Sequence, residues 1–318
     1  MLKLFANFFG KSDGGRSKLP LAVVKQAIER AVDATDPRVR IQSGYAKVLR
    51  KPVIHAVEYV IDLVDGFPQP IAVGKNALTD NPALAALLYS EARMEQIIER
   101  DAALREFRAA NPATTDPITA LLVAQKTEKH GFGHAEVDGQ VMSDVPQTTV
   151  GFDQHRLLEP AISEKETRRL LKRRAFDHLL SIALSQITVR KEERENLTSR
   201  KALLRSKLEV MRRGSGFAQH TVVLDQAQLQ TRLEELEAQL SELGATEDTL
   251  SENLATIAIV MAEAEKHLWP AEKVLCLDKL YVLHDKPKPS APPTVFKELH
   301  NSEGLQATFL MISIGSKP

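Results

Sequence analysis

Two histidines stand four residues apart in the segment His130-Gly-Phe-Gly-His134. Imidazoles at this spacing can share a metal ion when both lie on one face of a helix. The two intervening glycines disfavour a helix, so we interpret the segment as a turn between strands and predict no metal site. The single cysteine, Cys276, excludes a multi-cysteine zinc site and an intramolecular disulfide within this sequence, and its apolar neighbours indicate a buried thiol.

Two short segments imitate the end of a phosphate-binding loop: GKS beginning at Gly10 and VGK beginning at Val73. Phe5 and Gln69 stand where such a loop requires its first glycine, so neither segment fits. No nucleophile elbow, metalloprotease helix or dinucleotide fingerprint occurs. We therefore predict no catalytic residue and no cofactor. An enzyme with a pocket on the sheet remains an alternative.

A basic cluster begins the first of two long predicted helices. Its members are Lys165, Arg168, Arg169, Lys172, Arg173 and Arg174. The stretch expected to face it, residues 266–275, offers a single acid, Glu272, so the hairpin itself does not neutralise this charge. The cluster could bind nucleic acid, anionic lipid or an acidic partner, although aromatic residues are only 5% of the chain. The alternative is a solvated helix face, or one paired with acids of the N-terminal domain.

The connection between the two long helices, residues 212–224, is the preferred partner-binding site. It combines two cations with apolar side chains: Arg212, Arg213, Phe217, Val222, Val223 and Leu224. Apolar side chains at the far end of a long arm have no core of their own. We expect them either to fold back locally or to dock on another protomer or protein.

Two helical arms must position the basic cluster and the tip. In both arms apolar residues recur in alternating steps of four and three, a repeat that favours a coiled coil. The first arm carries Phe176, Leu180, Ala183, Ile187, Leu197, Leu204, Leu208 and Met211, and the second carries Leu229, Leu233, Leu236, Leu240, Leu243, Leu250, Leu254, Ile257, Met261, Ala264 and Leu268. Arg190, Arg194, Lys201 and Glu247 are the exceptions. Each stripe needs a facing stripe, so the arms are predicted to form an antiparallel hairpin.

The break between the arms sets their pairing. Residues 221–224 are expected to be extended, and Asp225 is expected to cap the second arm. If Met211 lies beside Leu229, Arg194 faces Glu247 in a polar layer that fixes the register.

The net charges of the two arms also favour their pairing. Residues 163–213 hold 15 basic and 7 acidic side chains, whereas residues 225–268 hold 2 basic and 10 acidic ones. Opposite charges therefore favour pairing of unlike arms, while burial of the apolar seam supplies most of the stabilisation.

The predicted fold class is α+β. A helical N-terminal region contains a helix that Asn81 caps and that continues to Phe107, and strands are expected at 118–124, 137–141 and 147–152. Later strands, at 274–283, 294–299 and 307–314, should complete a small mixed sheet, which makes the hairpin an insertion between strands. The predicted domains are a flexible amphipathic segment at 1–18, a helical domain at 19–112, the first part of a β-sheet domain at 113–160, the antiparallel coiled-coil hairpin at 161–269, and the second part of the sheet domain at 270–318 with a proline-rich connector at 286–293.

Composition narrows the functional classes only slightly. Lys plus Arg and Asp plus Glu number 42 each, so the net charge gives no hint of a polyanionic partner. No apolar run is long enough for a membrane span, which favours a cytoplasmic protein, with peripheral contact to a membrane as an option. The leading hypothesis is a non-catalytic interaction or assembly protein, a scaffold whose projecting hairpin contacts a protein partner or a second copy. The alternative is a peripheral binder of anionic lipid or nucleic acid.

Overall fold

The computed structural model describes residues 19–74, 76–112, 116–137, 140–214, 219–242 and 249–315. The chain divides into two compact units. The sheet unit contains Val57–Phe176 and Ala264–Pro318, and the helical unit contains Leu19–Ala56 and Asp177–Glu263. The fold is α+β, as the sequence predicted.

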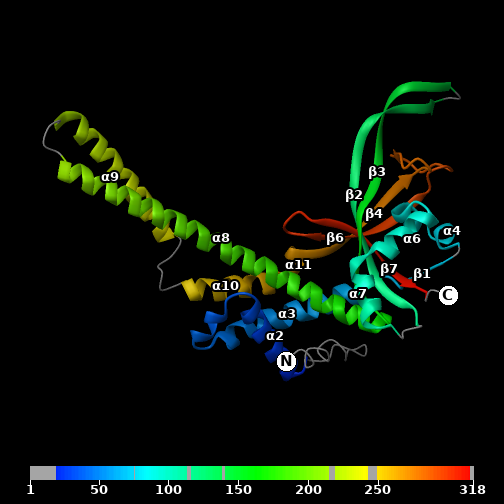
Figure 1. The fold of residues 1–318 in the computed structure, drawn as a ribbon, viewed down its shortest axis with the longest axis horizontal. Coiled ribbons are helices and arrows are strands. Elements are labelled where there is room, and N and C mark those ends of the chain that lie inside the picture. Colours follow the sequence, from blue (N-terminus) through cyan, green and yellow to red (C-terminus); the bar gives the residue numbers. More distant parts are fainter. Residues whose placement is uncertain are drawn as a thin grey trace. The chain divides into compact units, whose positions relative to one another are not determined.

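A mixed, mainly antiparallel sheet forms the centre of the sheet unit (Figure 1). Its strands within the described residues are β1 (Ile71–Val73), β2 (Ile118–Val137), β3 (Gln140–Ala161), β4 (Leu268–Leu277), β5 (Leu283–His284), β6 (Pro293–Asn301) and β7 (Gln306–Ile314). The order is β3-β2-β7-β6-β4-β5, and β1 pairs in parallel with β7. The backbone N–H of Val150 on β3 donates to the carbonyl of Tyr281, 2.9 Å away, just before β5. The sheet therefore curls until its two outer strands approach each other.

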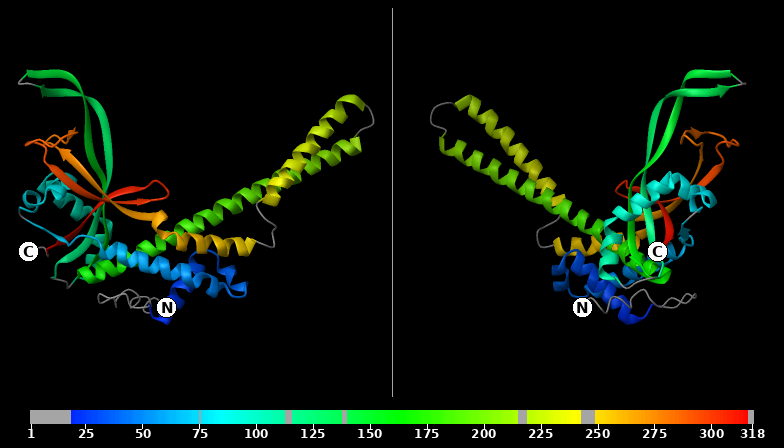
Figure 2. Two further views of the ribbon diagram at one scale, coloured as in Figure 1. Left: turned by 180° about the vertical axis from the view of Figure 1, so that it is seen from behind. Right: turned by 45° about the vertical axis from the view of Figure 1, so that its right-hand side comes forward.

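β2 and β3 form a long two-stranded ribbon rather than the three short strands that were predicted (Figure 2). β2 pairs with β7 only over Ile118–Ala124, so the rest of β2 is held by β3 alone. The predicted turn at His130–His134 is wrong, because this segment lies inside β2. A Cβ atom on Gly133 would stand 2.2 Å from Oε1 of Gln147, so this glycine makes room for a side chain of the opposite strand.

Helices cover both faces of the sheet. One face packs against α4 (Ala77–Asp80), α5 (Pro82–Leu88), α6 (Glu91–Arg100) and α7 (Ala102–Ala110), in a core where the rings of Phe152 and Phe296 lie 5.3 Å apart. On the other face, Phe67, which follows α3 (Tyr45–Asp65), contacts Phe309 at 4.5 Å. The hydroxyl of Thr167 near the start of α8 (Glu164–Gly214) donates to the carbonyl of Thr119 at 2.8 Å.

The helix expected from Pro82 to Phe107 is divided into three. Asn81 caps the first, as predicted, by accepting a hydrogen bond from the backbone N–H of Leu84. Ser90 and Asp101 cap α6 and α7 in the same way. Tyr89 lies between α5 and α6 with φ of 64°. These two extra caps satisfy backbone donors that a continuous helix would have bonded internally, and the chain turns at each of them.

The helical unit is a small bundle. It consists of α2 (Leu21–Ala34), the 3-10 helix η1 (Pro37–Ile41), the first part of α3, α8 from Asp177 onward, α9 (Gln219–Glu242) and α10 (Thr249–Ala262). Arg30 on α2 forms a two-pronged ion pair with Asp177 on α8. The predicted helical domain at 19–112 is thus divided between the two units, because the end of α3 packs on the sheet while α2 packs on α8.

α8 and α9 run antiparallel, and both views in Figure 2 show them side by side. Lys201 and Arg205 on α8 both pair with Glu237 on α9, at 3.1 and 2.8 Å. The predicted extended stretch at 221–224 is wrong, since α9 begins at Gln219. The β-branched residues there disfavour a helix by only tenths of a kcal/mol each, too little to interrupt one. At the other end of the hairpin, β4 begins at Leu268, six residues before the expected strand.

Candidate functional site

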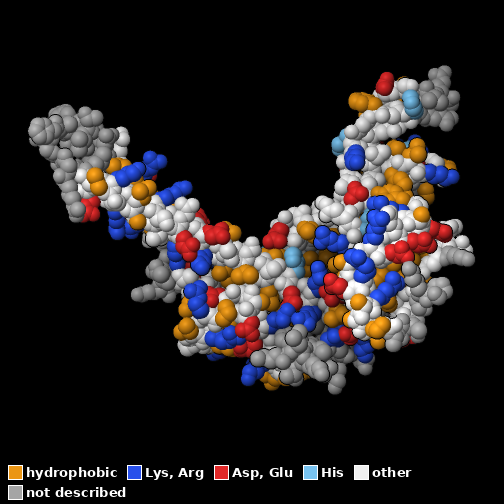
Figure 3. Space-filling view, in the orientation of Figure 1, with side chains coloured by type: hydrophobic (Ala, Val, Ile, Leu, Met, Phe, Trp, Pro, Cys, Tyr) orange, Lys and Arg blue, Asp and Glu red, His pale blue; other side chains and the backbone are white. Residues whose placement is uncertain are grey.

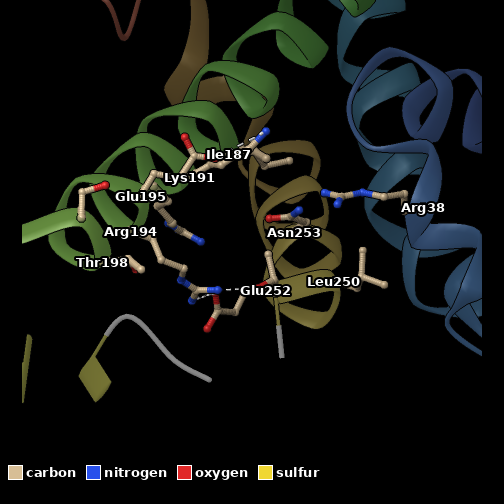
Figure 4. Close-up of a pocket in the computed structure, with 12 residues that line it drawn as sticks. Arg38, Ile187, Lys191, Arg194, Glu195, Thr198, Leu250, Glu252 and Asn253 are labelled. Atoms are coloured by element: carbon tan, nitrogen blue, oxygen red, sulfur yellow. Dashed lines mark hydrogen bonds and ion pairs between the residues drawn. The ribbon is translucent and has the colours of Figure 1, made fainter. Parts of the chain in front are cut away.

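A cavity lies within the helical unit, between α8, α10 and η1. Its volume is about 820 Å³. Figure 4 shows Lys191, Glu195 and Thr198 on α8 facing Glu252 and Asn253 on α10. Because every lining residue belongs to the helical unit, this cavity is a property of one compact body.

The cavity forms where the coiled-coil repeat fails. Arg190 and Arg194 occupy two seam positions of the first arm, and both line the cavity. Both arginines lie opposite α10, which begins at Thr249. Guanidinium groups need polar partners and room for water, whereas leucines at the same positions would close the seam.

Both arginines bond to side chains of α10. Nη1 of Arg190 donates to Oγ1 of Thr256 at 2.8 Å. Arg194 donates to the hydroxyl of Thr249 and lies 3.4 Å from the carboxylate of Glu252. Thr256 also donates to the carbonyl of Glu252 at 2.8 Å. The hydroxyl of Thr256 therefore has a partner besides Arg190.

The buried carboxylate of Asp36 positions Arg38, the residue of η1 that lines the cavity. Asp36 caps η1 by accepting a hydrogen bond from the backbone N–H of Arg38. Its carboxylate also accepts hydrogen bonds from Nε and Nη2 of the Arg38 side chain, both at 2.9 Å. Nδ2 of Asn253 on α10 donates to the same carboxylate at 2.8 Å. The hydrogen bonds from Arg38 lower the pKa of Asp36 below its usual value, against the effect of burial, and the bond from Asn253 acts in the same direction. Arg38 is thereby fixed at the cavity while its side chain stays 63% exposed.

The lining is cationic and rich in donors. Four cations outnumber two carboxylates among the lining residues, which also include three hydroxyls and an amide. These are Arg38, Arg190, Lys191 and Arg194, then Glu195 and Glu252, then Thr198, Ser199, Thr249 and Asn253. α10 begins at Thr249, which lines the cavity, and the positive end of a helix dipole adds to the attraction for anions. The arrangement is suited to binding an anion.

The predicted anion-binding cluster at the start of α8 is largely engaged inside the sheet unit. Arg168 pairs with Glu164 at 2.7 Å and donates to the carbonyls of Val64, Phe67 and Pro68. Lys172 is buried and pairs with Asp65 at 2.7 Å. Arg169 pairs with Glu166, Arg174 pairs with Glu159, and Arg173 also has a partner, whereas Lys165 is exposed. In the described part of the chain, Asp65 is the acid of the predicted N-terminal domain that pairs with the cluster, and the other acids lie on α8 itself and on β3. Anion binding by the cluster stays a prediction.

Two other predicted sites fall outside the described residues. The side chains of the tip, Arg212, Arg213, Phe217, Val222, Val223 and Leu224, are not described, so the tip stays a prediction. The same holds for Glu247, the expected partner of Arg194 in the polar layer. Arg194 pairs instead, in the described part of the chain, with Glu252.

The remaining candidates are His130 and Cys276. His130 contacts the hydroxyl of Thr148 at 3.0 Å. Among the described residues no group of three or more His, Cys, Asp or Glu side chains is placed to hold a metal ion. Cys276 is buried on β4, as expected.

Two of the residues that line the cavity could be singled out from the sequence. Arg190 and Arg194 stood out because they interrupt an apolar repeat. Asp36, Arg38 and Asn253 were missed, since nothing near Asp36 in the sequence indicates a partner 217 residues away. A buried, bonded carboxylate of this kind can be recognised only once the helices are assembled.

No helix in the described ranges combines the length and apolar character that crossing a membrane requires. Comparisons of the chain with profiles of protein families, with curated proteins and with solved structures found no match.

Proposed function

We propose that the protein is a non-catalytic interaction or assembly protein whose α8–α9 arm contacts a protein partner or a second copy. A cytoplasmic location belongs to the same proposal and rests on the sequence. The observation that carries it is a row of exposed apolar side chains on the outer side of α8. Val189, Leu203 and Val210 are 58, 58 and 67% exposed.

The row has helical periodicity. Its members are 14 and 7 residues apart, so they lie along one face of α8, apart from the seam that pairs with α9. Figure 3 shows hydrophobic side chains at the surface of this arm among Lys and Arg side chains. Arg200 and Lys207, which are exposed, lie one turn to either side of Leu203. This face therefore suits a third helix that brings apolar residues with acidic flanks.

Energetics favour covering such a row. Burying a leucine or valine is worth about 1.5–3 kcal/mol, whereas each exposed ion pair at the rim adds less than about 1 kcal/mol. The apolar row would supply most of the affinity, and the two cations would select an acidic partner. The acidic second arm of another copy has the required character, as does an acidic helix of a different protein.

The test compares a double variant with a matched control. Leu203→Glu combined with Val210→Glu places charge in the row, and both sites are exposed enough for folding to tolerate the change. Ile259→Glu makes the same kind of change at an exposed apolar site on α10, where the side chain is 54% exposed. Circular dichroism should show the same helix content for both.

Partner recovery from cell extract and the mass in solution are then measured for each protein. If the row binds a different protein, we expect the double variant to recover at least tenfold less of that partner than wild type. If the row binds a second copy, we expect the dimer of the double variant to dissociate at a concentration at least tenfold higher. Ile259→Glu should behave as wild type in both measurements. A further variant with a short Gly-Ser linker in place of residues 212–224 tests the tip separately. Equal recovery and equal mass for wild type and the double variant would argue against the outer row.

A further inference from the structure

We infer that the cavity between α8, α10 and η1 binds a small organic molecule carrying two or more phosphate groups. This site is separate from the outer row of α8 and does not depend on the proposed partner.

The seam arginines are the first step. A coiled coil gains most from apolar residues at its seam, and a cation there costs stability unless it serves another purpose. Sites that break a local folding rule are where function is expected. Arg190 and Arg194 break the rule on consecutive turns, so their backbone positions are about 6 Å apart along α8, and both side chains line the cavity.

Unused donors are the second step. A guanidinium has five N–H groups, and Arg190 uses one of them on Thr256. Among the described residues no carboxylate pairs with Arg190 within 4.0 Å. Its fork is therefore available for the paired oxygens of a phosphate, which guanidinium groups bind in a two-pronged manner.

Preorganisation is the third step. Asp36 fixes Arg38 through two hydrogen bonds, and Thr249 and Glu252 hold Arg194, so neither side chain has to be ordered when a ligand arrives. Side chains that are already held lose less entropy on binding. Lys191 is 66% exposed and lies 3.9 Å from Glu195, a loose pair from which the ammonium can turn toward an anion.

The size and the walls define the ligand class. A volume of about 820 Å³ lies in the range of small-molecule sites and is far larger than one inorganic anion needs. Ile187 and Leu250, labelled in Figure 4, supply apolar surface beside the cations. A molecule with an organic part and a charged oligophosphate part would use both kinds of wall.

The experiment is isothermal titration calorimetry on the full chain without divalent ions, with ATP, inorganic pyrophosphate, adenosine and citrate as probes. We expect ATP and pyrophosphate to bind wild type, more weakly as salt rises, and adenosine and citrate to bind at least tenfold more weakly than ATP. Failure of both phosphate probes to bind at 1 mM, roughly the weak limit for a specific site, would overturn the inference. Citrate binding as tightly as ATP would also overturn it, because the site would then not select phosphate. Adenosine binding as tightly as ATP would do the same, because the phosphate groups would then add nothing to the affinity.

Variants connect the binding to the cavity. Arg190→Leu should weaken ATP binding at least tenfold while leaving the melting temperature equal or higher, because leucine restores the seam and Thr256 keeps its bond to the Glu252 carbonyl. Lys191→Gln, at an exposed site, should weaken binding severalfold with no effect on folding. Arg205→Gln is the control, since Arg205 pairs with Glu237 and does not line the cavity. Equal ATP affinity in wild type, Arg190→Leu and Lys191→Gln would refute the site.

Discussion

Replacing Asn253 with alanine should destabilise the helical unit in a way that depends on pH. The amide of Asn253 donates to the buried carboxylate of Asp36 at 2.8 Å, and both residues are about 95% buried. A hydrogen bond to a charged group is worth about 1.5–3 kcal/mol. Asn253 also lines the cavity, so water can partly replace the lost donor, and we expect a loss near the lower end, about 1.5–2 kcal/mol at pH 7.

The pH dependence follows from the lowered pKa of Asp36, to which the bond from Asn253 contributes. A carboxyl whose folded pKa is lowered stabilises the protein above its unfolded pKa of about 3.9, and this contribution is lost as pH falls through the folded pKa. Without Asn253 the pKa of Asp36 rises toward its usual value. The difference in unfolding free energy between wild type and Asn253→Ala should therefore shrink as pH falls below about 4.

Urea unfolding followed by circular dichroism at several pH values measures both effects. Asn196→Ala is the matched control, since this asparagine is exposed on α8 in the same unit, and its effect should stay within about 0.5 kcal/mol. A loss for Asn253→Ala below about 0.5 kcal/mol at pH 7, or a loss that does not change between pH 7 and pH 3, would refute the role assigned to this buried pair.

Two further predictions concern the sheet unit. Burial lowers the pKa of His155, whose Nε2 lies 2.7 Å from the carbonyl of Leu87, so the folded state keeps this imidazole neutral while the unfolded chain is protonated below about pH 6.5. The contribution of His155 to the free energy of unfolding should be fully present above that pH and should decline as pH falls. His155→Gln, which can still donate to the carbonyl of Leu87, should show a smaller decline in urea unfolding between pH 7.5 and 5.5. Removing Asp65 from the Lys172–Asp65 pair should lower the free energy of unfolding more than removing Lys172, because Lys172 is buried whereas the Asp65 side chain is 45% exposed. Asp65→Asn leaves a buried unpaired ammonium and should cost about 3 kcal/mol, whereas Lys172→Met should cost less than about 1.5 kcal/mol, and equal costs in thermal unfolding would contradict this reasoning.

Local patterns in the sequence predicted the α+β class and much of the helical structure, although they missed the division of Pro82–Ala110 into three helices. The late strands at Pro293–Asn301 and Gln306–Ile314 were found because short segments rich in apolar and β-branched residues fall between turn signals. The cap at Asn81 was found because its side chain acts within three residues. Features set by contacts a few residues apart are thus accessible from the sequence alone.

Strand lengths and the cavity depend on distant parts of the chain. β2 continues through Gly131 and Gly133 because β3 bonds to it there, and nothing local to those glycines favours a strand. The wall at Arg38 exists because Asp36 meets Asn253, which requires the bundle to be assembled first. Pairing partners of this kind leave no periodic trace near either residue.

The exceptions in the apolar repeat divide into two kinds according to what lies opposite them. Lys201 is as much an exception as Arg190, yet it faces an intact part of α9 and pairs with Glu237 at 3.1 Å. Its charge is paired with a carboxylate within the hairpin, so Lys201 can fix the register of the two helices without a ligand. Arg190 faces the middle of α10, where its partner among the described residues is the hydroxyl of Thr256, and it lines the cavity. A seam cation that meets an acid across the hairpin is therefore structural, whereas one that meets a hydroxyl at the edge of a cavity is the better candidate for a binding role.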